Sequence, residues 1–293
     1  MILLSILVFI IIFSILVIVH ESGHFMAARI SNVKVEEFGL GMGKKIWGKK
    51  KGETEFTFNA VPFGGFVRLL GEEEESHDPR SFSKATLWKR IMITLAGVFM
   101  NMVLAVLLLT ILFSVGTEPI IITKTEFDTA IKNGVIKVSE PDKDGNQIIL
   151  DIQKVQKNFP QSFFFAITET ARISKAIVIK AGEIPMDILQ NHKIPKGISG
   201  PLGIAEVTNK VVPQGILPIL KLLAMLSLSL GVMNLLPIPA LDGGRFLFQI
   251  VELITFHKPR AKWENAIHGV GFFILMALMV AVTWNDIVRM FFS

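Results

Sequence analysis

Cysteine is absent from this chain of 293 residues, and charged residues are scarce. Without cysteine the protein has neither a disulfide framework nor thiol chemistry, so the sequence leaves its redox compartment open. Charged residues make up only 19% of the chain, whereas 51% of the residues are hydrophobic and the mean hydropathy is +0.54. This composition is too apolar for an ordinary soluble domain and predicts a multi-pass membrane protein. The net charge of +5 is modest, and nothing in the sequence indicates that the protein binds nucleic acid.

Four apolar stretches are long enough to cross a bilayer, which takes about 20 residues. They are Ile2–Val19, Ile91–Val115, Ile216–Leu236 and Ala266–Trp284. The third contains Lys221 and the fourth contains His268, so each of these side chains must snorkel or find a buried partner. The first stretch lacks the basic residues and the small-residue cleavage site of a secretory signal, and we predict that it is retained as a span.

The loops between the spans differ slightly in charge. Residues 29–90 are denser in Lys and Arg than the longer stretch 117–198. Because positively charged loops tend to stay in the cytoplasm, this bias favours 29–90 as the cytoplasmic loop and 117–198 as the outer segment. An even number of spans then places both termini on the outer side.

Both loops contain patterns typical of β-structure. Residues 54–61 alternate between apolar and polar side chains and predict a strand, and residues 66–69 predict a second strand after a turn at residues 62–65. Residues 72–75 predict a solvated acidic loop. In the outer segment the candidate strands are 120–123, 135–138 and 147–155, with a turn signal at residues 144–146.

Residues 163–180 have apolar side chains at near-helical spacing and predict an amphipathic helix. One interpretation places this helix on the membrane surface, where Arg172, Lys175 and Lys180 would meet lipid phosphates. The other packs it against the outer domain, and the sequence leaves both open.

A histidine and glutamate motif directly follows the first apolar stretch, as His20-Glu21-Ser22-Gly23-His24. Residues four positions apart lie on one face of a helix, so His20 and His24 can bind one metal ion together. Glu21 lies beside them, where a general base for a water molecule at the metal is needed. Ionisable groups in a membrane segment are costly, which favours a functional site over two helix-end histidines with an interfacial glutamate.

Two histidines leave a catalytic zinc ion one protein ligand short, because such sites usually supply three. The best candidate is Asp242, which follows the third span. Pro237 and Pro239 break the helix just before it at membrane depth, which is tolerated where the freed backbone faces protein or a water-filled cavity. The alternative is a surface turn in which Asp242 is an ordinary N-cap. The remaining histidines are weaker candidates: His268 within the fourth span, and His77, His192 and His257 in polar loops.

Together these motifs resemble the site-2 protease family of intramembrane zinc metalloproteases, in its bacterial branch that regulates sigma factors. Residues 20–24 fit the family motif H-E-x-G-H, and residues 234–244 fit its motif N-x-x-P-x-P-x-L-D-G-G. Supporting matches are residues 38–43, residues 62–67, residues 95–97 with Asn101, and residues 199–205. The match covers most of the chain.

The resemblance implies that His20, His24 and Asp242 bind one Zn²⁺ ion and that Glu21 is the base. It also implies a membrane-associated β region over residues 54–69, whose edge strand pairs with an extended substrate. The substrate-binding residues that it implies are Asn234, Pro237, Phe58, Asn59, Gly64 and Gly65. For Asn234 the alternative is a polar residue that satisfies the broken helix.

The outer segment departs from the family pattern. Members of the sigma-factor-regulating branch usually carry one or two PDZ domains between the second and third spans, and too few residues precede the amphipathic helix here for that fold. We therefore expect the PDZ domain to be reduced or missing. The short segment is then a candidate size filter for substrates.

The predicted fold is a mainly α membrane protein with about four transmembrane helices, a membrane-associated β-hairpin region and a small β-rich extramembrane segment. The expected units are the first span with the zinc-binding helix (1–30), a cytoplasmic-side loop with the β-hairpin (31–85), the second span (86–116), the small outer segment with its surface helix (117–198), the third span with the Asn/Pro/Asp-Gly motif (199–244), and a linker with the fourth span (245–293).

We predict an intramembrane zinc metalloprotease of the bacterial cytoplasmic membrane that cleaves peptide bonds within or beside the transmembrane segments of other membrane proteins. By the resemblance, its substrates are of the anti-sigma factor or remnant signal peptide type. One alternative is a non-catalytic membrane protein that binds substrates and retains the fold. Another is a zinc endopeptidase of a different membrane class, whose third ligand is a downstream glutamate on a helix. A Glu-x-x-x-Asp pattern would mark that ligand, and the candidates Glu206 and Glu252 do not lie in one. A metal transporter fits less well, because the polar residues cluster at two points of the chain.

Overall fold

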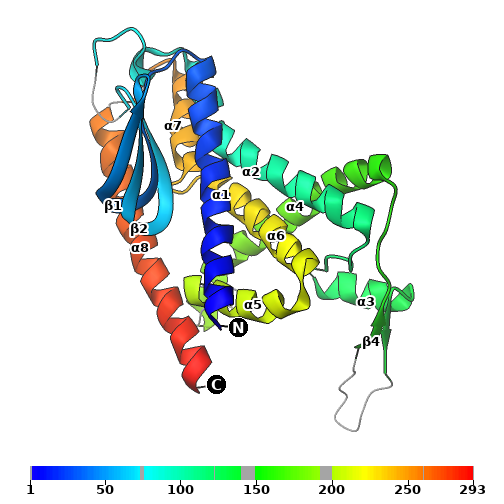
Figure 1. Cartoon of the computed structure of the whole chain (residues 1–293). Coiled ribbons are helices and arrows are strands. Elements are labelled where there is room, and N and C mark those ends of the chain that lie inside the picture. The colour runs from blue at the N-terminus through cyan, green and yellow to red at the C-terminus, as the bar shows by residue number, and fades with distance from the viewer. Residues whose placement is uncertain are drawn as a thin grey trace.

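The computed structural model describes residues 2–72, 76–121, 123–139, 149–191, 200–259 and 261–292. Its helices are α1 (Ile2–Ile30), α2 (Leu87–Val115), α3 (Lys124–Lys132), α4 (Phe159–Asn191), α5 (Pro201–Val211), α6 (Ile216–Leu235), α7 (Asp242–Thr255) and α8 (Ala261–Phe292). Its strands are β1 (Val35–Lys51), β2 (Thr54–Leu69), β3 (Ile136–Val138) and β4 (Ile149–Ile152). The chain is therefore mainly helical with small sheets, as predicted (Figure 1). The predicted turn at residues 144–146, His192 and most of the acidic loop lie outside the described residues.

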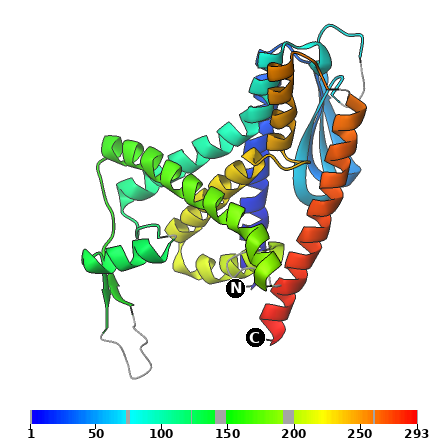
Figure 2. The same cartoon turned by 180° about the vertical axis from the view of Figure 1, so that it is seen from behind.

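Four helices are long and apolar enough to cross a membrane. They are α1, α2, α6 and α8, over Leu3–Ile30, Leu87–Val115, Ile216–Leu235 and Lys262–Met290. These helices confirm the four predicted spans. Helix α1 continues beyond Val19 to Ile30, so the histidine motif lies inside a continuous helix and not at the end of one. Both chain ends lie at the same end of the molecule, as an even number of spans requires (Figures 1 and 2).

Helix α2 is the centre of the bundle and packs against α1, α4 and α6. Leu109, Leu112 and Phe113 are almost completely buried and belong to one apolar core. Leu16 of α1 and Leu228 of α6 complete that core from two sides. Helix α1 is thus fixed to the bundle by large apolar side chains, each of which contributes about 1.5–3 kcal/mol when fully buried.

Lys221 of α6 finds hydrogen-bond partners at the edge of its apolar span. Its ammonium group donates to the backbone carbonyls of Glu118 and Pro119, at 3.1 and 3.4 Å. The charged end of the third span is therefore anchored to the loop that follows α2.

The sheet between α1 and α2 differs from the predicted hairpin. Residues 54–61 and 66–69 both belong to β2, and both segments pair with β1 instead of with each other. Phe38 of β1 has partners on two sides, Val67 and Phe56. The predicted hairpin pairing is therefore wrong, because β1 inserts between its two arms. Strand β1 is rich in glycine and lysine, which have low β-propensity, so tertiary pairing and not local preference forms it.

This sheet lies beside α1 (Figure 1) and is joined to it by aromatic rings. The ring of Phe25 on α1 packs edge-on against Phe38, with centroids 5.7 Å apart, and Phe38 in turn packs against Phe56. Farther along β1, Ile46 and Trp47 are 66% and 56% exposed. Exposed aliphatic and indole side chains suit a membrane interface, which agrees with a membrane-associated β region.

In the outer segment a helix begins directly after the expected strand 120–123, and the described residues Ile120, Ile121 and Thr123 do not form a strand. Thr123, the last residue of the expected strand 120–123, is the N-cap of α3, and its hydroxyl accepts from the backbone N–H of Glu126. The Glu126 carboxylate accepts in return from the N–H of Thr123, which completes a capping box. The expected strands at 135–138 and 147–155 are present in shortened form as β3 and β4, which pair with each other.

Helix α4 confirms the amphipathic helix, and its main contacts are with membrane-spanning helices. It packs against the spans α2 and α6 through a buried stripe of Ser162, Ala166, Thr170 and Ile173. Arg172, which the surface interpretation assigned to lipid phosphates, instead binds Glu169, Glu126 and the backbone carbonyl of Ile120. Within the outer segment, this charged cluster ties α3 and the residues before it to α4.

Two further helices flank the third span. Residues 242–255, expected as the end of a motif and part of a linker, form α7. Residues 201–211 form α5. Asp286, near the C-terminal end of α8, caps the N-terminus of α5. Its buried carboxylate accepts from the N–H groups of Gly200 and Gly203, at 2.9 and 2.8 Å. The fourth span is thereby held at the end of the molecule opposite to α7.

Candidate metal centre

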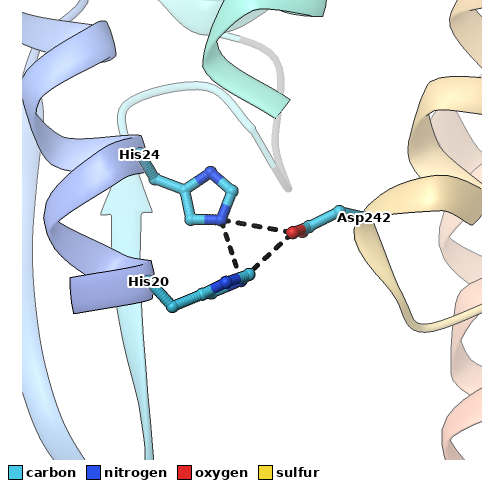
Figure 3. Close-up of side chains that lie close together, drawn as sticks. All are labelled: His20, His24 and Asp242. Carbon is cyan, nitrogen blue, oxygen red and sulfur yellow. Dashed lines mark hydrogen bonds and ion pairs between the residues drawn. The ribbon is translucent and has the colours of Figure 1, made fainter. Parts of the chain in front are cut away.

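Two helices bring the predicted zinc ligands together (Figure 3). His20 and His24 lie one turn apart on α1, and Asp242 is the first residue of α7. The Nε2 atoms of the two histidines are 3.3 Å apart. Oδ2 of Asp242 lies 3.1 Å from Nε2 of His20 and 3.4 Å from Nε2 of His24. Residues from opposite ends of the sequence therefore present three ligand atoms to one point.

The triangle has the dimensions that a zinc ion needs. Zinc lies about 2.0–2.2 Å from histidine nitrogen and carboxylate oxygen, so the ligands of a tetrahedral ion lie about 3.4 Å from one another. The three observed separations of 3.1–3.4 Å match that edge. Two imidazoles and one carboxylate also leave the fourth position for water or substrate, as in catalytic zinc sites. The residues present therefore fit zinc.

Helix α2 fixes the orientation of both histidine rings from behind. Nδ1 of His24 donates to the backbone carbonyl of Ile93 at 2.8 Å, and Nδ1 of His20 lies 3.2 Å from the side-chain amide of Asn101. Both rings thus turn Nε2 toward Asp242. Partners on the second ring nitrogen are the usual means by which proteins orient metal-binding histidines.

Close approach of α1 and α2 depends on two glycines. A Cβ atom built on Gly23 would lie 2.3 Å from the backbone oxygen of Ala96, and one on Gly97 would lie 2.3 Å from Nε2 of His24. Real Cβ atoms do not approach other atoms so closely. The glycine of the histidine motif and the glycine of the segment 95–97 therefore make room for the helix contact and for the two rings.

The broken end of the third span positions Asp242. Helix α6 ends at Leu235, and Ala240 adopts a φ of +75° before α7 begins. Two polar contacts then bind α7 to α2: Gln249 donates to the hydroxyl of Thr94 at 2.8 Å, and Glu252 forms a buried ion pair with Arg90. These contacts hold the helix whose first residue, Asp242, is the candidate carboxylate ligand.

The candidate metal centre opens onto a cavity of about 810 Å³. Glu21 lines this cavity together with both histidines and Asp242, and so does the strand segment Gly65–Leu69 of β2. A Cβ atom built on Gly65 would lie 3.1 Å from Cγ of Glu21, so the strand runs directly past that side chain. A carboxylate next to the metal ligands and an extended backbone therefore face the same space.

The charges around the cavity keep Asp242 ionised. Burial alone raises the pKa of its carboxyl, but the hydrogen bonds from His20 and His24 outweigh burial and hold the pKa below its usual range. Arg245, one turn farther along α7, also lines the cavity and forms an ion pair with Glu72. Burial lowers the pKa of Arg245, and the carboxylates of Glu264 and Glu21 oppose that effect.

The substrate-binding residues implied by the resemblance lie in different places. Gly65 lines the cavity, whereas Phe58, Asn59 and Gly64 are not among its lining residues. Asn59 is buried and its amide donates to the carbonyl of Gly41 at 3.1 Å, inside the sheet. Phe58 is 41% exposed on the sheet, and Gly64 sits at the bend of β2 with a φ of +81°.

The other two implied residues belong to the broken end of the third span. Asn234 is half-buried in the last turn of α6, and Pro237 is exposed in the loop that follows. Neither lines the cavity. The loop between them and Asp242 does reach it, through Ala240 and Leu241.

Of the other histidines among the described residues, only His268 lines the cavity. It is not one of the grouped metal ligands, and its Nδ1 accepts from the backbone N–H of Ala240 at 2.9 Å. This bond supplies the buried partner that an imidazole in the fourth span requires.

Several residues around the site carried no role in the sequence analysis. Thr94, Gln249, Arg90, Glu252 and Arg245 hold or surround α7, and the acceptor for His24 is a backbone carbonyl. No pattern in a single sequence marks a backbone acceptor. Among these residues, Arg90 lies at the start of an apolar span, and its charge there indicates that it needs an acidic partner.

Comparison with known proteins matches residues 8–278 to the family described as peptidase family M50. A protein of Clostridium perfringens named as a zinc metalloprotease is 33% identical, over 94% of this chain and 96% of its own length. A zinc metalloprotease of Fusobacterium nucleatum is 29% identical, over 98% of this chain and its whole length. The regulator of sigma-W protease RasP of Bacillus subtilis is 26% identical, over 98% of this chain and 99% of its own length.

These matches span nearly the whole chain and both ends of the candidate metal centre. They confirm the resemblance drawn from the histidine motif and the Asn/Pro/Asp-Gly motif. The chain therefore belongs to peptidase family M50, the site-2 proteases, and is a membrane-embedded zinc metalloprotease.

Proposed function

We propose that His20, His24 and Asp242 hold the zinc ion of this protease and that Glu21 is its general base. The observation that carries the proposal is the meeting of three ligand atoms within 3.1–3.4 Å of one another, at a cavity that Glu21 also lines. When bound, zinc lowers the pKa of a water molecule toward ~7 and polarises a scissile carbonyl. Glu21 accepts the proton of that water and later delivers it to the leaving amine.

The substrate binds in extended form along the Gly65–Leu69 segment. All pairings of this segment are with residues 35–40 of β1, and the segment lines the cavity, which supports a free edge for a further strand. A transmembrane helix must unwind before a base can reach its amides, because its backbone is otherwise fully hydrogen-bonded. Addition of the unwound segment to an exposed sheet edge replaces those hydrogen bonds.

The substrates are membrane proteins with a transmembrane segment of the anti-sigma factor or remnant signal peptide type. Support comes from one relative, which is named for the regulation of sigma-W. The enzyme acts in the bacterial cytoplasmic membrane, with its cavity near the cytoplasmic face. The charge of residues 29–90 supports this orientation, because that loop contains the sheet beside the cavity.

The outer segment acts as a size filter for substrates. It contains only α3 and the pair β3 and β4 among its described residues before α4, and Arg172 binds it to α4 through Glu126. Replacing residues 124–152 by a short Gly-Ser linker should allow cleavage of substrates with a long outer domain. Unchanged selectivity of the shortened enzyme would disprove the filter without affecting the proposed zinc site.

Cleavage in liposomes tests the catalytic assignment. The purified protein is reconstituted with a single-span substrate whose outer part is already short, and cleavage is followed by mass spectrometry of the products. Loss of a general base costs about 10²–10⁴-fold in rate, so Glu21→Gln should abolish measurable cleavage and retain zinc. A phenotype that survives Glu21→Gln would instead favour the non-catalytic binding protein.

Contacts of the two candidate glutamates argue against a zinc endopeptidase of another class. Glu252 is paired with Arg90, and Glu206 is paired with Lys210 and Arg289. Neither belongs to the grouped ligand atoms among the described residues. A downstream glutamate as third ligand therefore has no support at this site.

A further inference from the structure

The edge of the His20 ring that carries Nδ1, opposite to Nε2, faces a single buried amide. Asn101 lies on α2 with no exposed surface, and its side-chain amide is 3.2 Å from Nδ1 of His20. The carbonyl oxygen of that amide, Oδ1, is buried and has no hydrogen-bond partner among the described residues. An unsatisfied buried carbonyl costs about 1–3 kcal/mol, so its presence next to a metal ligand calls for an explanation.

The chemistry of His20 determines which atom of the amide must face it. A neutral imidazole carries one N–H, on either Nδ1 or Nε2. Nε2 of His20 points at Nε2 of His24 and Oδ2 of Asp242, where a zinc ligand must offer a lone pair. The proton of His20 must therefore reside on Nδ1, which then needs a hydrogen-bond acceptor.

Only one orientation of the Asn101 amide supplies that acceptor. The oxygen and nitrogen of an asparagine side chain are assigned from the hydrogen-bond network, because their positions are nearly equivalent. With Nδ2 toward the ring, Nδ1 of His20 would have to accept, and a proton on Nε2 would block the metal position. With Oδ1 toward the ring, Nδ1–H donates to Oδ1, and the Nδ2 group moves to the buried position that Oδ1 held.

His24 already shows the same arrangement. Its Nδ1 donates to the backbone carbonyl of Ile93 on the same helix, at 2.8 Å. The two histidines of α1 thus find their two acceptors on α2. We propose that Asn101 is a positioning residue that accepts the Nδ1 proton of His20 and so fixes the tautomer and ring orientation with which His20 binds zinc.

One hydrogen bond from the third span reaches the backbone of Asn101, and not its side-chain amide. The hydroxyl of Ser227 on α6 donates to the backbone carbonyl of Asn101 at 2.8 Å, and both residues are completely buried. The inference rests on the proposed ligand set, because it assigns a partner to one of its members. Removal of such a partner typically weakens metal affinity 10–100-fold.

Zinc affinity of the full-length protein in detergent tests the inference directly, by competition with a chromophoric chelator. Asn101→Leu keeps the size of the side chain but removes the acceptor, and should weaken zinc affinity by about 10–100-fold. Asn101→Asp keeps an acceptor oxygen and should stay within about threefold of the wild type. Ser227→Ala is the matched control, since it removes a buried hydrogen bond to the same residue without touching His20, and it should also stay within about threefold.

Three results would overturn the inference: wild-type affinity in Asn101→Leu, an equal loss in Asn101→Asp, or an equal loss in Ser227→Ala. The first two would deny an acceptor role, and the third would attribute the effect to helix packing. His20→Ala separates these failures from a failure of the ligand set. If His20→Ala loses zinc while Asn101→Leu does not, only the inference on Asn101 fails; if His20→Ala keeps its zinc, the proposed ligands are wrong.

Discussion

The imidazole Nδ1 of His268 accepts a hydrogen bond of 2.9 Å from the backbone N–H of Ala240. Ala240 has a φ of +75°, in the left-handed region, which costs a residue other than glycine roughly 1–3 kcal/mol. The bond connects the fourth span to the loop directly before Asp242. It therefore holds a strained backbone in the position from which the carboxylate meets the two histidines.

Replacement of His268 by alanine should weaken the site through this loop. Without its acceptor the Ala240 N–H is left unpaired, the loop relaxes, and Asp242 moves relative to α1. We expect zinc affinity to fall about tenfold, at the lower end of the range for lost supporting contacts, and cleavage to fall with it. Chelator competition and the liposome assay measure the two effects.

Two related variants control for this interpretation. His268→Asn places an amide oxygen where Nδ1 lies and should keep most of the affinity. Ala240→Gly, introduced into His268→Ala, should restore part of it, because glycine adopts a positive φ without steric cost. Wild-type zinc affinity in His268→Ala would show that the loop holds its position without the bond.

Zinc content should depend equally on both ends of the chain. His20, His24 and Asp242 each supply one atom of the triangle, so alanine at any of the three leaves two protein ligands. Atomic absorption on the purified protein should give about one zinc ion per wild-type chain and a loss in all three variants, as expected for a catalytic site with three protein ligands. Glu21→Gln should keep its zinc. Retention of zinc by Asp242→Ala alone would mean that the third ligand lies elsewhere.

Acid should release the metal by protonating the histidines and not Asp242. The pKa of the Asp242 carboxyl is held below its usual range, so this ligand stays ionised as the pH falls through the histidine range. Metal ligands bind in their deprotonated forms, so zinc affinity should fall as the pH falls and protons compete with the metal ion for the histidine nitrogens. Zinc titrations at several pH values between about 5 and 8 measure how zinc affinity changes with pH. A site that loses zinc only below about pH 4 would be governed by carboxylates instead.

The four spans and the pairing of the two histidines on α1 could be predicted from sequence because their signals are local and strong. Long apolar runs identify helices α1, α2, α6 and α8, and the spacing of His20 and His24 already fixes a common helical face. Asp242 is different. Its approach to the histidines results from the tertiary packing of α7 on α2, and only its costly place after two prolines pointed to it.

The elements that were missed depend on contacts between distant residues. Strand β1 is rich in glycine and lysine and is held by pairing with two arms of β2. The first turn of α7 contains Gly243 and Gly244, which disfavour a helix, and Arg90 and Thr94 of α2 bind α7 in place. Helix α3 is the exception, since Thr123 and Glu126 are a capping-box signal present in the sequence itself.

Gly97 should not tolerate even one additional methyl group. A Cβ atom there would lie 2.3 Å from Nε2 of His24 and 2.8 Å from Nε2 of His20, so both rings would have to leave the triangle. Gly97→Ala should therefore reduce zinc affinity by at least about tenfold. Gly182→Ala is the matched control: this glycine lies in α4 with open space around it, and alanine there should stabilise the helix by up to about 1 kcal/mol. Normal zinc binding by Gly97→Ala would show that α1 and α2 can separate without loss of the site.

Proline substitutions in the Gly65–Leu69 segment can test whether the substrate adds to its edge. Neighbouring residues of a strand direct their N–H groups to opposite sides, so of Phe66 and Val67 one faces β1 and the other faces the cavity. Proline removes the N–H in each case. The variant that loses the cavity-facing N–H should cleave at least about tenfold more slowly, with its thermal stability and zinc content unchanged. One lost hydrogen bond to an extended substrate is worth about 0.5–1.5 kcal/mol, and misalignment of the substrate slows cleavage further.

The neighbouring variant loses a hydrogen bond to β1 and should instead lower the thermal stability. Comparison of the two separates substrate pairing from sheet integrity, because both carry the same residue in the same strand. Equal cleavage by both variants, at unchanged stability, would mean that the substrate does not use this edge. The extended backbone beside Glu21 would then serve only to shape the cavity wall, and the substrate would have to be held by the loop at residues 237–241.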